Sequence, residues 1–263
     1  MNDIYQELWT AFNDIYFVDS THSYTDSLNT KFTSVTAFVS NFVRKMTDEE
    51  WTVIAKRCID SKSKKNAKYN GKTVEEVRDM WSQTGEYART LGTEIHSVME
   101  HLWQNKDYAG NMELMKNYEG MIEDFNFRKK YCKTLFDKMK KFYIPIKNEF
   151  IVYDVDNALC GTIDFLAYNT VKNCYSIIDW KTSKSFDTSS YSHEKLLYPM
   201  QDYDACNVNE YSIQLSTYAW ILEKHCPSIK IGEMTLFQIP NSSVTPTIVQ
   251  CNDLRVCLNK ILK

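Results

Sequence analysis

The spacing of apolar residues along the chain changes from a helical period to strand-like alternation near residue 143. Before this point, Thr47 and Thr73 each precede acidic residues and an apolar stripe, which is typical of a helix start. After it, alternating apolar residues predict strands interrupted by one helix. The predicted strands are 13–19, 23–36, 144–153, 159–168, 175–182, 231–239 and 244–250. Two predicted helices begin after Ser34 or Thr36 and after Thr47. Four more cover 73–104, 112–141, 208–225 and 252–262. Gly85 is a position where the helix over 73–104 can be interrupted.

These elements predict one α/β core with a mostly helical N-terminal half. We expect a single domain over 1–263, composed of an N-terminal elaboration over 1–90 and a catalytic core over 91–263. Hydrophobic residues make up 43% of the chain and charged residues 25%, as in ordinary soluble proteins. No apolar run approaches the roughly 20 residues that a membrane span needs, and the N-terminus lacks the pattern of a secretory signal. We therefore expect a soluble, intracellular protein without a membrane partner.

The eight cysteines are scattered along the chain and form no CxxC pair. In an intracellular protein such residues are mostly reduced and buried. Cys251 and Cys257 have the one spacing that hints at an iron–sulfur cluster, and we do not expect such a cluster here.

The net charge of −3 hides an uneven distribution of charge. Residues 56–72 carry seven Lys or Arg against one acid, and residues 128–147 carry eight against one, which leaves 16 bases and 32 acids elsewhere. Two basic stretches in an acidic protein are expected when phosphate is bound along a track. The alternative is that each stretch is an ordinary solvated helix face.

Two acids occupy mirror-image positions on a predicted β-hairpin. If the turn is centred between Val171 and Lys172, then Asp164 and Asp179 face each other with Cβ atoms roughly 5 Å apart. Opposed carboxylates destabilise a sheet unless a cation lies between them. Strand alternation places Lys181 on the same face as Asp179. Two carboxylates and an ammonium that converge on one point suit metal-assisted attack on a phosphodiester.

Two further positions extend this group of candidates. Glu149 lies on the strand before the hairpin, where a surface glutamate is the ordinary alternative. His96 flanks the buried stripe of a helix, and Gly92, one turn earlier, leaves an opening through which a metal or a phosphate could approach. Glu100 shares this face and could orient the imidazole. A plain boundary histidine is the alternative.

Polar and aromatic side chains offer candidate contacts to a ligand. Gln214 and Tyr218 are four residues apart on one helical face, where an amide and a phenol can together bind a phosphate or a base. Trp81, Tyr87 and Tyr191 are candidates for stacking on bases, with structural burial as the alternative for each.

Taken in order, these pieces resemble the motifs of the PD-(D/E)XK nuclease superfamily. The resemblance is closest to its RecB-like exonuclease branch, which includes phage exonucleases and the mitochondrial genome-maintenance exonuclease. It covers about residues 90–220. The matching motifs are Gly92-Thr93-x-x-His96, Glu149, Gly161-Thr162-x-Asp164, Asp179-x-Lys181 and Gln214-x-x-x-Tyr218. The third motif departs from the commoner Glu-x-Lys by using Asp179, as this branch often does, and the first 90 residues match no family pattern.

The resemblance implies a restriction-endonuclease-like core, with a central mixed sheet flanked by helices, and one or two Mg²⁺ or Mn²⁺ ions. By this resemblance, the metal ligands are His96, Asp164, Asp179 and the Trp180 backbone carbonyl. The catalytic group comprises Lys181, Asp179, Asp164 and Glu149, with Gln214 and Tyr218 in contact with DNA.

The function that follows is a metal-dependent DNA exonuclease that acts on single strands or duplex ends in recombination, repair or phage DNA metabolism. A phage or a virus whose protein acts in the host cell is one candidate source. Three alternatives remain open. One is a structure-dependent endonuclease on the same fold, and another is a catalytically silent DNA-binding module. The third is an ordinary α/β protein in which the hairpin acids are coincidental.

Overall fold

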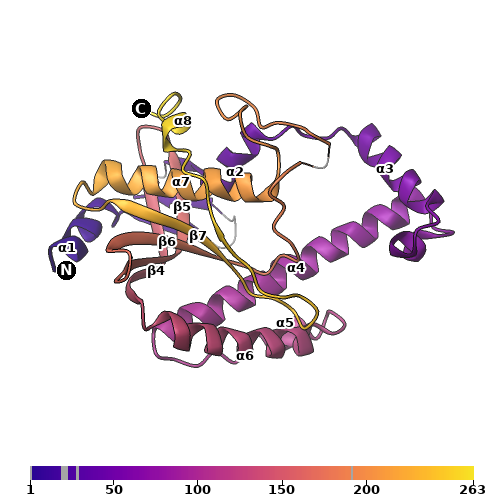
Figure 1. The fold of residues 1–263 in the computed structure, drawn as a ribbon, viewed down its shortest axis with the longest axis horizontal. Coiled ribbons are helices and arrows are strands. Elements are labelled where there is room, and N and C mark those ends of the chain that lie inside the picture. The colour runs from indigo at the N-terminus through magenta and orange to yellow at the C-terminus, as the bar shows by residue number, and fades with distance from the viewer. Residues whose placement is uncertain (1, 19–22, 28–29, 191) are drawn as a thin grey trace.

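The fold has three layers, with one mixed sheet between helices on both faces (Figure 1). The structure is a computed structural model that describes residues 2–18, 23–27, 30–190 and 192–263. Helix α7 (Asn207–His225) covers one face of the central strands, and α4 (Val74–Trp103) and α6 (Met121–Met139) cover the other (Figure 1). This arrangement confirms the predicted α/β class with a central mixed sheet flanked by helices.

The sheet is organised around β5 (Leu159–Asn169), which pairs antiparallel along its length with β4 (Tyr143–Asp154). The other edge of β5 is divided between two partners. Its beginning pairs with β3 (Lys31–Ser34) in parallel, and its end pairs with β6 (Cys174–Lys181) as a hairpin. Beyond β6 lie β7 (Ile231–Gln238), parallel to it, and β8 (Ile248–Gln250).

Alternating side chains of these strands contribute to two separate cores because successive residues of a strand point to opposite faces. The core beneath α7 contains Val152, Leu166 and Ile177 from the sheet. The core beneath α4 and α6 contains Phe165, Ile178 and Trp180 instead. Burial on both faces explains why β5 and β6 read as nearly continuous apolar runs.

The N-terminal region contributes strands to the same sheet. After α1 (Asn2–Ala11), which the sequence did not predict, β1 (Ile15–Val18), β2 (Ser23–Asp26) and β3 extend the sheet beyond β5. Asp19, within the predicted strand 13–19, lies outside the described residues, as do 20–22 and 28–29. The expected boundary at residue 90 falls inside α4.

Residues 35–103 are mostly helical, with short connections between the helices. Helix α2 (Val35–Val39), capped by Ser34, and the 3₁₀ turn η2 (Ser40–Phe42) lie against the body. Helix α3 (Asp48–Asp60) and η3 (Lys64–Tyr69) follow. Thr47 and Thr73 form capping boxes with the glutamates three residues later, which confirms both predicted helix starts. Helix α4 is continuous through Gly85, so no interruption occurs there.

The segment predicted as one helix over 112–141 is two helices, α5 (Met112–Met115) and α6. Gly120 separates them with φ of 73°, a left-handed conformation that glycine adopts at little cost. The chain ends in α8 (Arg255–Leu258), shorter than predicted. None of the helices in the described ranges combines the length and apolarity of a membrane span.

Candidate metal centre

The β5–β6 hairpin has the register that the sequence predicts. Phe165 pairs with Ile178, so the next position along the two strands brings Asp164 opposite Asp179. The turn is therefore centred between Val171 and Lys172, as expected. The two carboxylates lie at the open end of the hairpin, where the backbone pairing of β5 with β6 stops.

A third carboxylate continues this row on the next strand. The β4–β5 pairs on either side, at Asn148 and Phe150, place Glu149 opposite Asp164. Glu149 has φ of 43°, a left-handed conformation that costs a residue with a side chain on the order of 1 kcal/mol or more. The acid row, defined as Glu149, Asp164 and Asp179, thus crosses three neighbouring strands.

The sheet opens at the acid row because a side chain replaces a backbone partner. The amide N–H of Trp180 donates to Oδ2 of Asp164 at 2.9 Å instead of joining the β5–β6 ladder. Asp164 is thereby fixed in orientation, with its side chain 10% exposed. The divided edge of β5, shared by β3 and β6, makes this opening possible.

His96 contacts the acid row from the face of the sheet that α4 and α6 cover. Its Nε2–H donates to the carbonyl oxygen of Trp180 at 2.8 Å. Its Nδ1 lies 3.4 Å from Oδ2 of Asp164 and 3.9 Å from Oε1 of Glu149. The predicted ligands His96 and Trp180 therefore lie side by side, and their metal ligation stays a prediction.

Lys181 lies on the other side of the acid row. Its Nζ is 2.6 Å from Oδ2 of Asp179, with angles unsuited to a hydrogen bond, and that buried oxygen finds no donor elsewhere in the described residues. The same ammonium lies 4.4 Å from the ring centre of Tyr211, a cation–π contact. Burial favours the neutral amine, but the charges of Asp179 and Asp164 outweigh it and raise the pKa of Lys181 to about 12. The lysine is thus an ammonium at neutral pH.

Crowded carboxylates raise one another's pKa when no cation is present. Burial, with the charges of Asp164, Glu100 and Asp179, raises the pKa of Glu149 to about 9. Burial also raises the pKa of Asp179 to about 6, although Lys181 opposes this. This concentration of negative charge is the electrostatic setting in which a divalent cation binds.

The residues present fit a divalent metal ion. Within the described part of the chain, His96, Glu149 and Asp164 form the one group of three His, Cys, Asp or Glu side chains whose ligand atoms lie within 4.8 Å of one another. Carboxylate oxygens with one imidazole suit Mg²⁺ or Mn²⁺. All eight cysteines are free thiols.

Gln214 and Tyr218 lie on α7, beneath the sheet. Tyr218 is 3% exposed, and Gln214 Nε2 donates to its hydroxyl at 3.2 Å. The Tyr218 ring packs against Gly161, where an added Cβ would come within 2.7 Å of a ring carbon. The first residue of the Gly161-Thr162-x-Asp164 motif thus makes room for the tyrosine. Contact of Gln214 and Tyr218 with DNA stays a prediction, and their packing role is what the structure shows.

A pocket of about 490 Å³ lies beside the acid row, at the opening predicted next to Gly92. Sequence reasoning missed Arg89, which lines it together with His96 and Glu149. Arg89 lies two helical turns before His96, so the period of α4 was the available signal. Tyr211 was also missed, although it lies three residues before Gln214 on the same helix.

The candidate stacking residues have other contacts. Trp81 donates its indole N–H to the hydroxyl of Tyr69 at 2.9 Å, and Tyr87 packs edge-on against Tyr118. Tyr191 lies outside the described residues. Base stacking by these residues stays a prediction.

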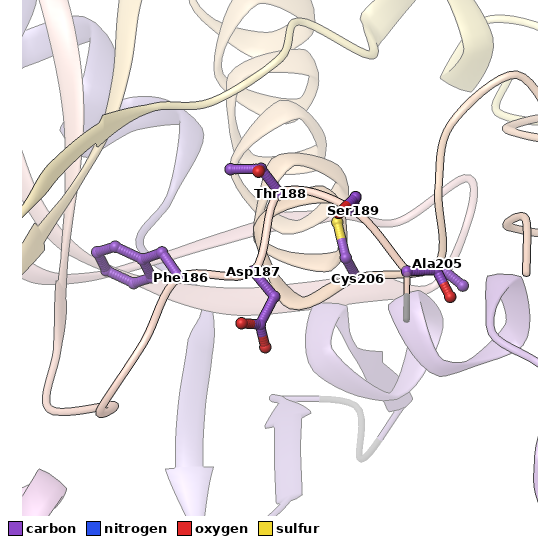
Figure 2. A pocket seen from close by; sticks show the side chains of 7 residues that line it. Phe186, Asp187, Thr188, Ser189, Ala205 and Cys206 are labelled. Atoms are coloured by element: carbon purple, nitrogen blue, oxygen red, sulfur yellow. The ribbon is translucent and has the colours of Figure 1, made fainter. Parts of the chain in front are cut away.

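A second hollow of about 520 Å³ lies in the loop between β6 and α7 (Figure 2). Its walls come from the loop and from Cys206 at the start of α7, and none of the predicted site residues lines it. Asp187 closes the loop by donating its amide N–H to Asn207 Oδ1 at 2.8 Å. This hollow is therefore separate from the metal centre. Its lining residues are Phe186, Asp187, Thr188, Ser189, Ser190, Ala205 and Cys206.

Comparison with known proteins agrees with this geometry. The sequence pattern of the PD-(D/E)XK nuclease superfamily matches residues 66–255, a range that includes His96, the acid row and Lys181. No curated protein matches the chain. Membership implies hydrolysis of phosphodiester bonds, and the group of His96, Glu149 and Asp164 is a candidate divalent-metal site of that chemistry. The chain belongs to the PD-(D/E)XK nuclease superfamily.

Proposed function

We propose that this protein is a metal-dependent DNA exonuclease that removes nucleotides from DNA ends in recombination, repair or phage DNA metabolism. The observation that carries the nuclease chemistry is the acid row, with His96 on one side and the Lys181 ammonium on the other. We further propose that it acts inside a cell, its own or that of a phage host. The exonuclease assignment is supported by the motifs shared with the RecB-like branch, in particular Gly92-Thr93-x-x-His96.

In this proposal, Asp164, Asp179, His96 and the Trp180 carbonyl hold one or two Mg²⁺ or Mn²⁺ ions, and Glu149 supports the site. The bound metal would polarise the phosphoryl oxygen and lower the pKa of a water. Asp164 keeps its orientation through the Trp180 amide, so at least one ligand is positioned before the metal binds.

Lys181 stabilises the negative charge that develops on the phosphoryl group. The charges of Asp179 and Asp164 keep Lys181 protonated in the metal-free protein, and the protonated form is the one that stabilises negative charge. The contacts with Asp179 and the Tyr211 ring hold the ammonium in place. Gln214, whose amide donates to the Tyr218 hydroxyl, is proposed to contact DNA together with Tyr218.

Digestion of end-labelled linear DNA tests the proposal directly. We expect degradation from the ends with Mg²⁺ or Mn²⁺ and none in EDTA. Asp179→Asn should abolish turnover, and Lys181→Met should reduce it by about a hundredfold or more because a charge-stabilising group is lost. Exposed Lys130→Met is the matched control and should retain parental activity. Circular dichroism checks that each variant is folded.

A covalently closed circular DNA substrate distinguishes an exonuclease from an endonuclease. An exonuclease leaves the circle intact while it consumes the linear form. Equal cutting of both would replace the exonuclease proposal with a structure-dependent endonuclease on the same site. Absence of turnover in every divalent metal, combined with tight DNA binding, would instead point to a silent DNA-binding module.

A further inference from the structure

A small structural unit lies at the far end of α4 from the metal centre (Figure 1). This unit, the arm, comprises residues 48–81, namely α3, η3 and the first two turns of α4. The arm has a hydrophobic core of its own, in which Ala55, Tyr69 and Val77 are buried. This core is separate from the two cores on the faces of the sheet. The arm is therefore an independently packed projection carried on α4.

The basic side chains of residues 56–72, within the arm, pair with none of the acids in the described residues. Within the described residues, the seven Lys and Arg of 56–72 form no ion pair, and six of them are exposed. Three of the seven acids of the arm are engaged elsewhere: Glu50 and Glu76 complete the capping boxes, and Asp48 pairs with Arg78 at 2.5 Å. The seven bases of 56–72 thus remain available to an external anion.

The second basic stretch differs in this respect. On and after α6, Arg128 is buried against Asp124, Lys129 and Lys133 pair with Asp107, and Lys140 pairs with Asp137. Four of its eight bases are therefore paired with acids within the protein. The structure distinguishes two stretches that look alike in the sequence.

Helix α4 fixes the spacing between the arm and the metal centre. Val74, where α4 begins next to the basic segment 56–72, and His96 are 22 residues apart, about 33 Å along a helix that rises 1.5 Å per residue. At 3.4 Å per base pair, this span equals about 10 base pairs of duplex. A second contact, Arg44 with Glu50 at 2.9 Å and with Glu194 at 3.1 Å, ties the arm to the loop after β6.

We propose that the arm binds the phosphate backbone of the DNA substrate about 10 base pairs from the metal centre, an inference that rests on the proposed nuclease function. Exposed, unpaired lysines release counterions from phosphates on binding, so their contribution depends strongly on salt. Because α4 is continuous, the arm contact and the cleavage position are held at a fixed separation. The basic stretch on α6 plays no part in this contact.

Binding of DNA fragments of graded length tests the arm. In an Asp179→Asn background, the variant K62Q/K64Q/K65Q is compared with the charge-matched control K130Q/K138Q/K141Q by fluorescence anisotropy. Single strands and duplexes from 6 to 30 units are used. Long fragments of whichever form binds more tightly, single strand or duplex, give the main comparison. On these fragments, the slope of log Kd against log salt should be smaller by about 3 for the arm variant than for the parent. At low salt the arm variant should bind about tenfold more weakly. The control should keep the parental slope.

The loss should diminish as the DNA shortens and vanish below about 10 base pairs, because such fragments do not reach the arm. An equal loss on short and long DNA, or an equal loss in the control, would overturn the inference. Cleavage by the parent enzyme separates the two proposals. If the parent digests DNA while the arm variant binds like the control, only the arm inference fails. If the parent digests nothing, the nuclease proposal fails whatever the arm binds.

Discussion

At the scale of single residues, the metal centre concentrates features that oppose stability. Three carboxylates lie side by side, and Glu149 has a left-handed backbone conformation. Each feature costs free energy in the metal-free protein. Such costs persist where the site needs that arrangement, which is why local sequence rules fail there.

The two motif glycines should respond differently to substitution. Gly161→Ala forces a Cβ to within 2.7 Å of the buried Tyr218 ring, so we expect unfolding free energy to fall by about 1–3 kcal/mol. At Gly92 the nearest contact of a Cβ is 3.6 Å, an ordinary distance within a helix. Gly92→Ala should therefore be neutral or stabilising by up to about 1 kcal/mol. Urea denaturation measures both, and equal effects would contradict this account.

At the scale of elements, the sheet is held at both ends by buried charged groups. Near the metal centre, Arg128 on α6 donates to the carbonyls of Thr182 and Ile239, which follow β6 and β7. At the other end, Glu233 on β7 accepts from Ser176 on the adjacent β6, from Asn169 at the end of β5 and from Lys172 in the hairpin turn. These contacts fix the relative positions of the strands that carry the acid row.

Glu233 should make part of the stability depend on pH. Burial favours its protonated form, but hydrogen bonds from Lys172, Ser176 and Asn169 outweigh burial and lower its pKa. A lowered pKa stabilises the fold above the unfolded-state value, and this contribution is lost as pH falls through the folded-state value. Glu233→Gln should therefore cost about 1–3 kcal/mol at pH 7, with the difference from the parent shrinking below about pH 4.5.

Exposed Glu119→Gln is the control for Glu233→Gln, since Glu119 makes no ion pair within the described residues. Urea denaturation between pH 3 and pH 8 measures both. A cost for Glu233→Gln that is constant across this range would show that the carboxylate charge does not matter.

At the scale of the whole molecule, metal binding should be coupled to global stability. A ligand that binds only the folded state stabilises it by about 2.7 kcal/mol at a hundredfold excess over Kd. Mn²⁺ should therefore raise the Tm of the parent by about 5 °C. Asp164→Asn should lose this gain but be more stable than the parent in EDTA, because it removes repulsion from Glu149 and Asp179. Asparagine retains an acceptor for the Trp180 amide.

Exposed Asp202→Asn is the control for this experiment and should gain as much from Mn²⁺ as the parent. Thermal unfolding followed by circular dichroism gives all three Tm values with and without the ion. Equal Mn²⁺ gains in Asp164→Asn and the parent would contradict metal ligation by Asp164.

The sequence by itself determined the elements that depend on short-range pattern. The capping boxes at Thr47 and Thr73, the three core strands and α7 follow from local periodicity and side-chain chemistry, and they appear nearly where predicted. The pairing of Asp164 with Asp179 was predictable for the same reason, since a hairpin fixes its register through its own turn. Gly120 is also a local feature of the sequence that can interrupt a helix, but its left-handed conformation became evident only from the backbone of the structure.

Only the tertiary structure decided what depends on contacts distant in the sequence. It placed Glu149 opposite Asp164, brought Arg89 to the metal pocket, buried Tyr218 against Gly161 and joined β3 to β5. It also showed that four bases of the α6 stretch pair with acids, whereas the bases of 56–72 form no ion pair within the described residues. Charge and polarity in a sequence state what a residue can do, whereas its partner is set by the packing of the whole chain.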